Sequence, residues 1–270
     1  MGRHSVPPPE GLRHDARRLY GLDPEGYDAG RPAYPERVYD VLRDRCAIGS
    51  GTRVLEIGPG TGQATHRLAA WGAKVTAVEP DPALARYLGT TMSGRAVEVG
   101  AASFEDADLG DAAFDAVVAA MSFHWVDQRV GVPKLWRILR PGGWAALWWT
   151  VFGDPARDDP FVDATRWLLS DGAGAAGRGG QPQFELDEAA RTADLSCAGF
   201  DGVECELLRW TIRLDPAALR RLYASTIAVR RRPPLERERV LDGVVAVAVD
   251  LFGGVVERPF VTALYTARRM

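Results

Sequence analysis

Short apolar runs alternate along this chain with longer segments in which apolar residues recur at helical spacing. The runs that predict strands are 53–57, 74–78, 96–99, 114–120, 144–151, 203–214 and 259–268. The segments that predict helices are 35–46, 63–70, 83–88, 128–139, 161–169, 187–198, a stretch that begins after Asp215-Pro216, and 240–252. Two helices are thus expected between the last two strands. This alternation predicts an α/β fold on a largely parallel sheet.

The first predicted strand, 53–57, leads directly into a glycine-rich turn at 58–62, which reads Gly-Pro-Gly-Thr-Gly. Gly58, Gly60 and Gly62 can adopt positive φ and let the backbone approach a ligand closely. The helix that follows would direct its N-terminal N–H groups toward that ligand. The pattern predicts a pocket for a nucleotide-like cofactor.

Three details of this turn favour a cationic ligand without phosphate. A dinucleotide fingerprint has glycine at its sixth position, where this chain has Gln63. Pro59 removes one backbone donor, and Glu56 places a carboxylate just before the turn. S-adenosylmethionine has the matching character, because it carries a sulfonium and an ammonium group and no phosphate.

A second acidic residue, Glu79, follows the predicted strand 74–78. Asp81 and Pro82 come next and are typical of a helix start. Glu79 should therefore lie at the carboxyl end of its strand, beside the glycine-rich turn, where a carboxylate can bind ribose hydroxyls. The alternative is a surface acid with no ligand.

Four features in order resemble class I S-adenosylmethionine-dependent methyltransferases, of the small-molecule group with a type 11 domain that includes trans-aconitate-type enzymes. They are 27–35 (Tyr-Asp-Ala-Gly-Arg-Pro-Ala-Tyr-Pro), 56–62, 122–125 (Ser-Phe-His-Trp) and 139–143 (Leu-Arg-Pro-Gly-Gly). The resemblance covers about residues 20–150. It implies a Rossmann-like, seven-stranded, mostly parallel sheet with an antiparallel last strand, helices on both faces and a small helical cap.

The resemblance also implies which residues contact the two substrates. The cofactor contacts would be Tyr27, Arg31, Glu56, Gly58, Gly60, Gly62, Glu79, Pro80, Ser103, Phe104 and Ala120. Tyr34, Trp125 and Trp149 would contact the methyl acceptor. Arg31 would pair with the methionine carboxylate. Near Ser103 this chain departs from the family's commoner Gly-Asp-Ala form, so Glu105, Asp106 or backbone groups remain alternatives for binding the adenine.

His124 follows the apolar run 114–120, whose carboxyl end should lie at the ligand-binding edge of the sheet. Imidazole has an ordinary pKa of about 6.5, so His124 is a candidate general base toward the acceptor. The alternative is that His124 makes a structural hydrogen bond while Trp125 packs in the core.

Four segments are expected within a single structural domain. They are a tail and the start of a helical lid at 1–26, the cofactor-binding core at 27–150, an inserted lid or linker at 151–190, and the rest of the sheet with acceptor-capping helices at 191–270. Within the insertion, the glycine-rich stretch 172–180 has the composition of a mobile linker.

The net charge and the cysteine content limit the kinds of partner and the cellular location that are expected. A formal net charge of −3 gives no general attraction to nucleic acid. Cys46, Cys197 and Cys205 have no metal or disulfide spacing, which predicts reduced thiols, a cytoplasmic protein and no metal. No apolar stretch approaches 18 residues, so no membrane association is expected. The expected partner is a small-molecule acceptor, and the protein should be a monomer or homodimer.

The acceptor itself is the most open question. Enzymes that this chain resembles include methyltransferases of the indole C3 carbon in tryptophan-derived natural products, and the tryptophans near the expected pocket fit an aromatic acceptor. A carboxylic-acid O-methyltransferase of the trans-aconitate type is the alternative and would need an arginine cluster. An NAD(P)-dependent oxidoreductase and a non-catalytic cofactor-binding protein are further alternatives.

Overall fold

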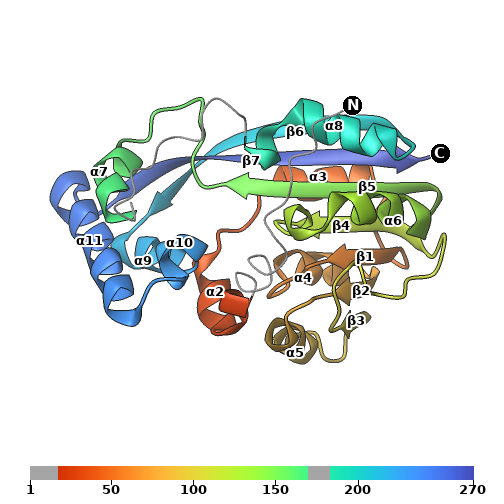
Figure 1. The fold of residues 1–270 in the computed structure, drawn as a ribbon, viewed down its shortest axis with the longest axis horizontal. Coiled ribbons are helices and arrows are strands. Elements are labelled where there is room, and N and C mark those ends of the chain that lie inside the picture. Colours follow the sequence, from red (N-terminus) through yellow and green to blue (C-terminus); the bar gives the residue numbers. More distant parts are fainter. Residues whose placement is uncertain (1–17, 170–182) are drawn as a thin grey trace.

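A seven-stranded sheet runs through the computed structural model, which describes residues 18–169 and 183–270. The strand order is β3-β2-β1-β4-β5-β7-β6 (Figure 1). The strands are β1 (Arg53–Ile57), β2 (Lys74–Val78), β3 (Val97–Gly100), β4 (Phe114–Ala120), β5 (Leu139–Val151), β6 (Phe200–Leu214) and β7 (Val256–Arg269). Strands β1 to β5 pair in parallel with one another, and β7 runs antiparallel to both of its neighbours, β5 and β6. The expected mixed, Rossmann-like sheet is confirmed.

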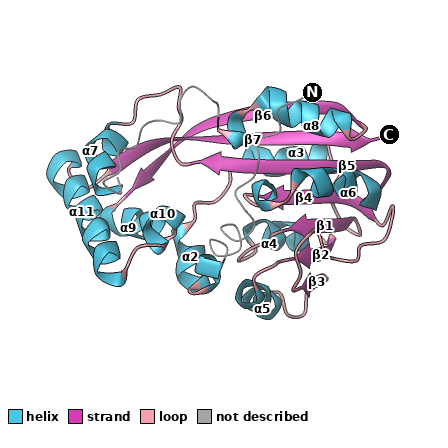
Figure 2. Cartoon of the chain, viewed as in Figure 1, coloured by secondary structure: helices cyan, strands magenta, loops and turns pink. Residues whose placement is uncertain are grey.

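Helices cover both faces of the sheet (Figure 2). One face packs against α3 (Glu36–Asp44), α4 (Gln63–Ala70) and α5 (Pro82–Thr91), and the other against α6 (Gln128–Ile138) and α8 (Glu188–Cys197). The central strand β4 contributes to both cores, because Val117 faces one and Val118 the other, and both are fully buried. A strand buried on both faces must be apolar throughout, which is why its sequence is a continuous apolar run.

A helical cap surrounds the long ends of β6 and β7, at the left of Figure 1. It consists of α7 (Pro160–Leu169), α9 (Pro216–Ala224), α10 (Ile227–Arg230) and α11 (Pro234–Phe252). The prediction of two helices between the last two strands is wrong, because the short α10 interrupts the connection. Residues 1–17 and 172–180, predicted as a tail and a linker, lie outside the described residues.

Two other boundaries differ from the sequence prediction. The first helix predicted from the sequence is 35–46, but α2 (Pro24–Gly30) precedes it, with the side chain of Asp23 accepting a hydrogen bond from Gly26 N at 2.9 Å. An aspartate cap followed by proline is a strong start signal that the glycines in this helix obscured. The strand predicted to start at Trp144 begins five residues earlier, at Leu139.

A buried arginine on β7 ties the cap to the sheet. Arg258 is 2% exposed and forms an ion pair with Asp159 before α7. Its guanidinium also donates to the Tyr223 hydroxyl at 3.2 Å and to the Phe152 carbonyl at 3.0 Å. A single cation therefore satisfies acceptors from α9, from the segment after β5 and from the approach to α7.

Replacing this arginine should destabilise the whole protein. Arg258→Met leaves the Asp159 carboxylate buried without its cation, and we expect a loss of about 3–5 kcal/mol in the free energy of unfolding. Urea unfolding measures it. The control is Arg213→Met on β6, whose ion pair with Glu257 is exposed, with side chains 72% and 63% accessible, and which should cost under about 1 kcal/mol. Equal losses would contradict this role of Arg258.

Candidate active site

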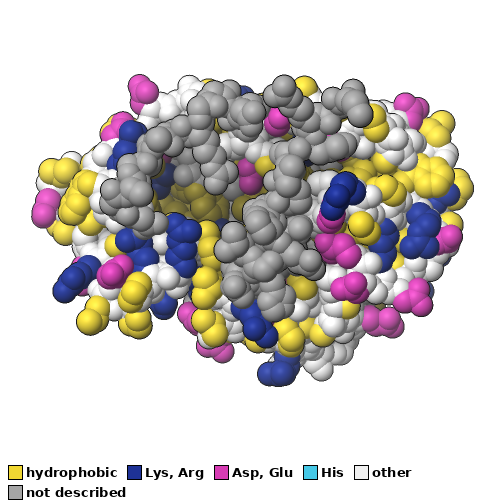
Figure 3. Space-filling model, viewed as in Figure 1, with side chains coloured by type: hydrophobic (Ala, Val, Ile, Leu, Met, Phe, Trp, Pro, Cys, Tyr) yellow, Lys and Arg dark blue, Asp and Glu magenta, His cyan; other side chains and the backbone are white. Residues whose placement is uncertain are grey.

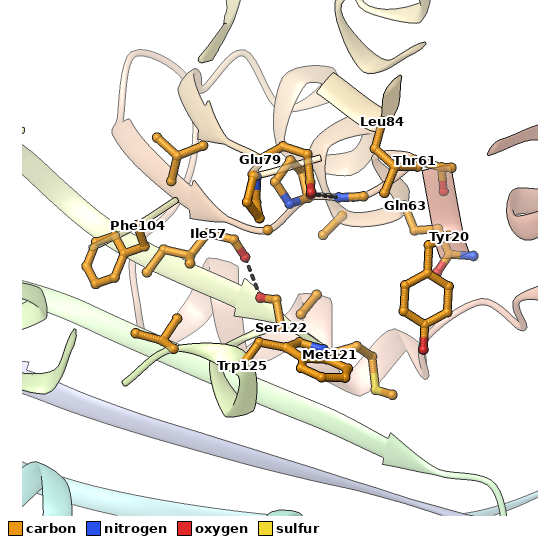
Figure 4. A pocket seen from close by; sticks show the side chains of 18 of the residues that line it. Tyr20, Ile57, Thr61, Gln63, Glu79, Leu84, Phe104, Met121, Ser122 and Trp125 are labelled. Carbon is orange, nitrogen blue, oxygen red and sulfur yellow. Dashed lines mark hydrogen bonds between the residues drawn. The ribbon is translucent and has the colours of Figure 1, made fainter. Parts of the chain in front are cut away.

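The carboxyl ends of β1, β2 and β4 meet at an open cavity of about 1040 Å³, a volume that includes its mouth. Figure 4 shows Glu79, Leu84 and Gln63 on one wall and Met121, Ser122 and Trp125 on the facing wall. The predicted site residues that line this cavity are Tyr27, Arg31, Tyr34, Gly58, Gly60, Glu79, Pro80, Phe104, Ala120, His124 and Trp125. We call it the cofactor cavity.

The three glycines of the turn have different roles although all have positive φ. A Cβ on Gly58 would lie 2.6 Å from the Cβ of Ser122, and one on Gly62 would collide with Leu88. At Gly60 the nearest atom to a Cβ would be a ring carbon of Tyr27 at 3.8 Å. Gly60 therefore leaves space at the cavity, whereas Gly62, which does not line it, is required for packing.

Glu79 is held in place by the backbone around it. One carboxylate oxygen accepts from Gly60 N (Figure 4) and the other from Asp81 N, each at 3.0 Å. The residue is 5% exposed and lines the cavity. A carboxylate oxygen can accept more than one hydrogen bond, so these bonds orient the group without preventing contact with ribose hydroxyls. The acid and the glycine turn thus form one unit that fits an adenosine.

Glu56 was predicted to contact the cofactor, but it lies outside the cofactor cavity. It is 1% exposed, does not line the cofactor cavity, and accepts from Thr65 Oγ1 on α4 at 2.6 Å. Burial raises the pKa of Glu56 to about 7, the Thr65 hydrogen bond opposes the rise, and the nearby Glu79 charge adds to it. Glu56 therefore links β1 to the helix behind the turn.

The loop after β3 closes the cavity at Phe104 and Glu105. Lys134 on α6 donates to the carbonyl of Glu105 at 3.0 Å, and also to that of Ala107. The Glu105 side chain accepts from Asp127 N at 2.9 Å, which ties this loop to the segment after β4. Ser103 bonds instead to Asp106 and does not line the cavity. Phe104 and Glu105 are thus the side chains of this loop that line the cavity.

Aromatic and cationic side chains from the N-terminal segment close the other end. The Arg31 guanidinium lies 4.7 Å from the ring centre of Tyr27 and donates to the carbonyl of Ser225, after α9, at 3.0 Å. Tyr34 packs edge-on against Trp148. Arg31, Tyr27 and Tyr34 also border a smaller cavity that continues to Thr150 and Phe152 under the cap. We call it the cap cavity.

The chain leaves β4 through a strained residue. Met121 has φ +55° without being glycine, and its sulfur accepts from Thr150 N at 2.8 Å. The hydroxyl of Ser122 then donates to the carbonyl of Ile57 on β1 (Figure 4). Left-handed backbone at a non-glycine residue is uncommon and clusters at functional sites. This bend turns His124 and Trp125, in η1 (Phe123–Trp125), to the cavity.

Behind His124 lies Trp149 on β5. The indole nitrogen of Trp149 donates to Nδ1 of His124 at 2.9 Å. Trp149 is 0% exposed and does not line the cofactor cavity, so the structure does not bring it to the position predicted for an acceptor contact. Since Nδ1 already accepts a hydrogen bond, a general-base role for His124 would require the Trp149 bond to break.

Several lining residues were missed from the sequence. Tyr20 had been assigned to the tail, Gln63 was read only as a departure from the dinucleotide pattern, and Met121 gave no signal beyond its place directly after a central strand. That position was the available clue, because residues following parallel strands meet at the ligand edge.

Neither a metal centre nor a transmembrane helix occurs in the described part of the chain. Residues 18–169 and 183–270 hold no group of three potential metal ligands and no helix able to cross a membrane. The three cysteines are unpaired, and the predicted cytoplasmic location stays a prediction. On the face drawn in Figure 3, basic and acidic side chains are interspersed over the described surface.

The raised pKa of Glu56 predicts how stability depends on pH. The folded state binds a proton more tightly than the unfolded chain, so this stabilisation is complete below about pH 4.5 and is lost as the pH rises through about 7. Glu56→Gln does not titrate. Relative to wild type it should gain about 1–3 kcal/mol between pH 5 and pH 8, measured by urea unfolding. Thr65→Val should move the loss to higher pH, and parallel curves for Glu56→Gln and wild type would contradict the assignment.

Known proteins that resemble this chain include methyltransferases, which agrees with the geometry of the cavity. A methyltransferase domain family matches residues 55–147. An uncharacterized methyltransferase of Mycobacterium tuberculosis is 33% identical over 235 residues, which are 86% of each chain. A solved structure, a putative type II methyltransferase from Anaeromyxobacter dehalogenans, is 26% identical with a TM-score of 0.63 and covers 89% of this chain and 98% of its own.

A more distant structure holds the demethylated cofactor. It is a Haemonchus contortus N-methyltransferase in complex with S-adenosylhomocysteine, 12% identical with a TM-score of 0.56, and the match covers 96% of this chain and 58% of that one. At this identity the likeness concerns the fold alone. The sequence relatives and the glycine turn beside Glu79 go further than the fold. The chain belongs to the class I S-adenosylmethionine-dependent methyltransferases and uses S-adenosylmethionine as its cofactor.

Proposed function

We propose that this methyltransferase methylates a small aromatic acceptor, with an indole C3 carbon of a tryptophan-derived natural product as the specific candidate. The observation that carries the proposal is the aromatic lining of the cavity, where Tyr34 and Trp125 line the same cavity as His124 and the rings of Trp125 and His124 lie 4.9 Å apart. Aromatic walls with few polar groups suit a flat aromatic ligand.

The lining argues against a polyanionic acceptor of the trans-aconitate kind. Such a substrate would need several arginines, and Arg31 is the single basic side chain among the described residues that line the cofactor cavity. Its guanidinium also packs on Tyr27 and donates to Ser225 O. One arginine suits one carboxylate, that of the methionine end of the cofactor. Because the chain belongs to the methyltransferase family, the alternative of an NAD(P)-dependent oxidoreductase is dropped.

The proposed roles divide the predicted residues into two groups. Tyr27, Arg31, Gly58, Gly60, Glu79, Pro80, Phe104 and Ala120 would hold the cofactor, and Tyr34, His124 and Trp125 would contact the acceptor. Glu79 would orient the ribose, and the tyrosines would exclude water. Glu56, Gly62 and Ser103 would act through the backbone that they support.

The chemistry needs positioning more than covalent participation by the enzyme. When bound, S-adenosylmethionine supplies an electrophilic methyl group, whose bond to sulfur breaks with its electron pair returning to sulfur. The π electrons of the indole form the new carbon–carbon bond at C3, which already bears the side chain of a tryptophan-derived acceptor and carries no proton. The positive charge that this leaves on the ring nitrogen is removed when the N–H proton leaves to water. Trp125 and Tyr34 would hold the acceptor plane, and these aromatic side chains would keep competing water away.

A product screen tests the acceptor class. The purified protein would be incubated with S-adenosylmethionine bearing a deuterated methyl group and with tryptophan, tryptamine, indole-3-acetate, trans-aconitate or citrate. Mass spectrometry should find the labelled methyl on an indole carbon. Methylation of trans-aconitate instead would favour the carboxylic-acid alternative, and cofactor binding without transfer to any of these would contradict the proposal.

The same assay tests the aromatic wall. Trp125→Ala should lower kcat/KM about 10- to 100-fold, because a stacked aromatic contact is lost at the acceptor. Trp136→Ala is the control, since Trp136 lies on α6 and donates to the carbonyl of Gly199, away from the cavity. A loss that is equal in both variants would remove Trp125 from the acceptor site.

A further inference from the structure

We infer that Trp149 fixes the protonation state of His124, so that its Nε2–H donates a hydrogen bond to the methyl acceptor and does not remove a proton from it. The part that concerns the acceptor rests on the proposed function. The part that concerns the ring of His124 does not, because it follows from a contact within the protein.

The contact joins two side chains whose hydrogen-bonding capacities are fixed by chemistry. An indole N–H is a donor only, and a neutral imidazole has one protonated and one unprotonated nitrogen. Trp149 Nε1 lies 2.9 Å from Nδ1 of His124. Nδ1 must therefore be the unprotonated nitrogen, and the single proton of the neutral ring is on Nε2.

The indole of Trp149 is held by aromatic neighbours. Its ring packs edge-on against Tyr265, with ring centres 5.9 Å apart, and against Phe184 in η2 (Phe184–Leu186) at 5.6 Å. The Tyr265 hydroxyl donates to the carbonyl of Glu185 at 3.0 Å. Trp149 has no exposed surface. Its N–H therefore remains directed at His124.

A buried cation supports this stack from α8. The Arg191 guanidinium lies 3.6 Å from the ring centre of Phe184 and donates to the Phe184 carbonyl at 3.0 Å. It also pairs with Asp194, with side chains 6% and 12% exposed. The ring of Phe184 lies 6.4 Å from that of His124. The support of His124 thus includes residues about sixty positions beyond it in the chain.

This arrangement limits the acceptors that His124 can serve. A base needs a nitrogen lone pair facing the substrate, but a proton on Nδ1 would meet the N–H of Trp149, leaving both donors without an acceptor. His124 is therefore unsuited to acceptors that must lose a proton before attack, such as phenols or ammonium groups. It fits a carbon nucleophile that carries a carbonyl, carboxylate or other lone pair near the methylated atom.

The tautomer is measured directly on the full chain without cofactor or acceptor. Two-bond ¹H–¹⁵N correlation spectra distinguish a protonated from an unprotonated ring nitrogen, and His124→Gln identifies the signals of His124 among the four histidines. Wild type should show the proton on Nε2. Trp149→Phe should populate both tautomers, whereas Trp136→Phe should leave the pattern unchanged. A proton on Nδ1 in wild type would overturn the inference, whatever the acceptor is.

Kinetics with the acceptor found by the product screen test the donor role. Glutamine also offers an N–H, so His124→Gln should keep kcat/KM within about fivefold of wild type, while His124→Ala should lose about 10- to 100-fold. A general base predicts instead that both variants lose about 100-fold or more. Because the spectra need no turnover, a failed acceptor screen and a failed tautomer assignment remain distinguishable.

Discussion

The parallel register of β1 with β2 and β4 is the constraint on which the site depends. Ile57 pairs with Val78, and Glu56 pairs with Val118. Because all three strands run in the same direction, the residues that follow them meet at one edge of the sheet. The glycine turn, Glu79 and the bend at Met121 converge there although they are far apart in the sequence. Shifting one strand by a residue would turn its side chains to the opposite face and separate these groups.

Two arginines connect the cap to the rest of the fold. Arg31 reaches from the N-terminal segment to the Ser225 carbonyl beside α9, and Arg258 fixes the same helix to β7. The cap cavity is lined by residues outside the cap helices, and one of them, Phe152, packs against the apolar core of the cap.

The sequence predicted those features whose signal is local. The strand 114–120 was predicted with its observed bounds, because a strand buried on both faces is apolar throughout. The positions of Glu79 and of the glycine turn followed from strand ends and turn chemistry. The direction of a side chain relative to the sheet was not predictable in this way. Glu56 lies two residues before Gly58, yet its carboxylate faces α4, because alternate residues of a strand point to opposite faces.

Contacts between segments that are distant in the chain could not be predicted from the sequence either. The bond from Trp149 to His124 joins β5 to the segment after β4, and its support comes from Arg191 on α8. No spacing in the chain indicates that these residues meet. The sequence predicted that His124 lies at the ligand-binding edge of the sheet, and His124 does line the cofactor cavity. Its bond with Trp149 became visible only in the packed structure.

Calorimetric titration with S-adenosylmethionine, of wild type and of Glu79→Ala, tests the central claim most directly. The matched control is Glu98→Ala, at an exposed position on the neighbouring strand β3 and outside the cofactor cavity. The account predicts binding that Glu79→Ala weakens about tenfold or more and that Glu98→Ala leaves unchanged, with no binding of NADH. Equally tight binding by Glu79→Ala and wild type would contradict the placement of the cofactor at this edge of the sheet.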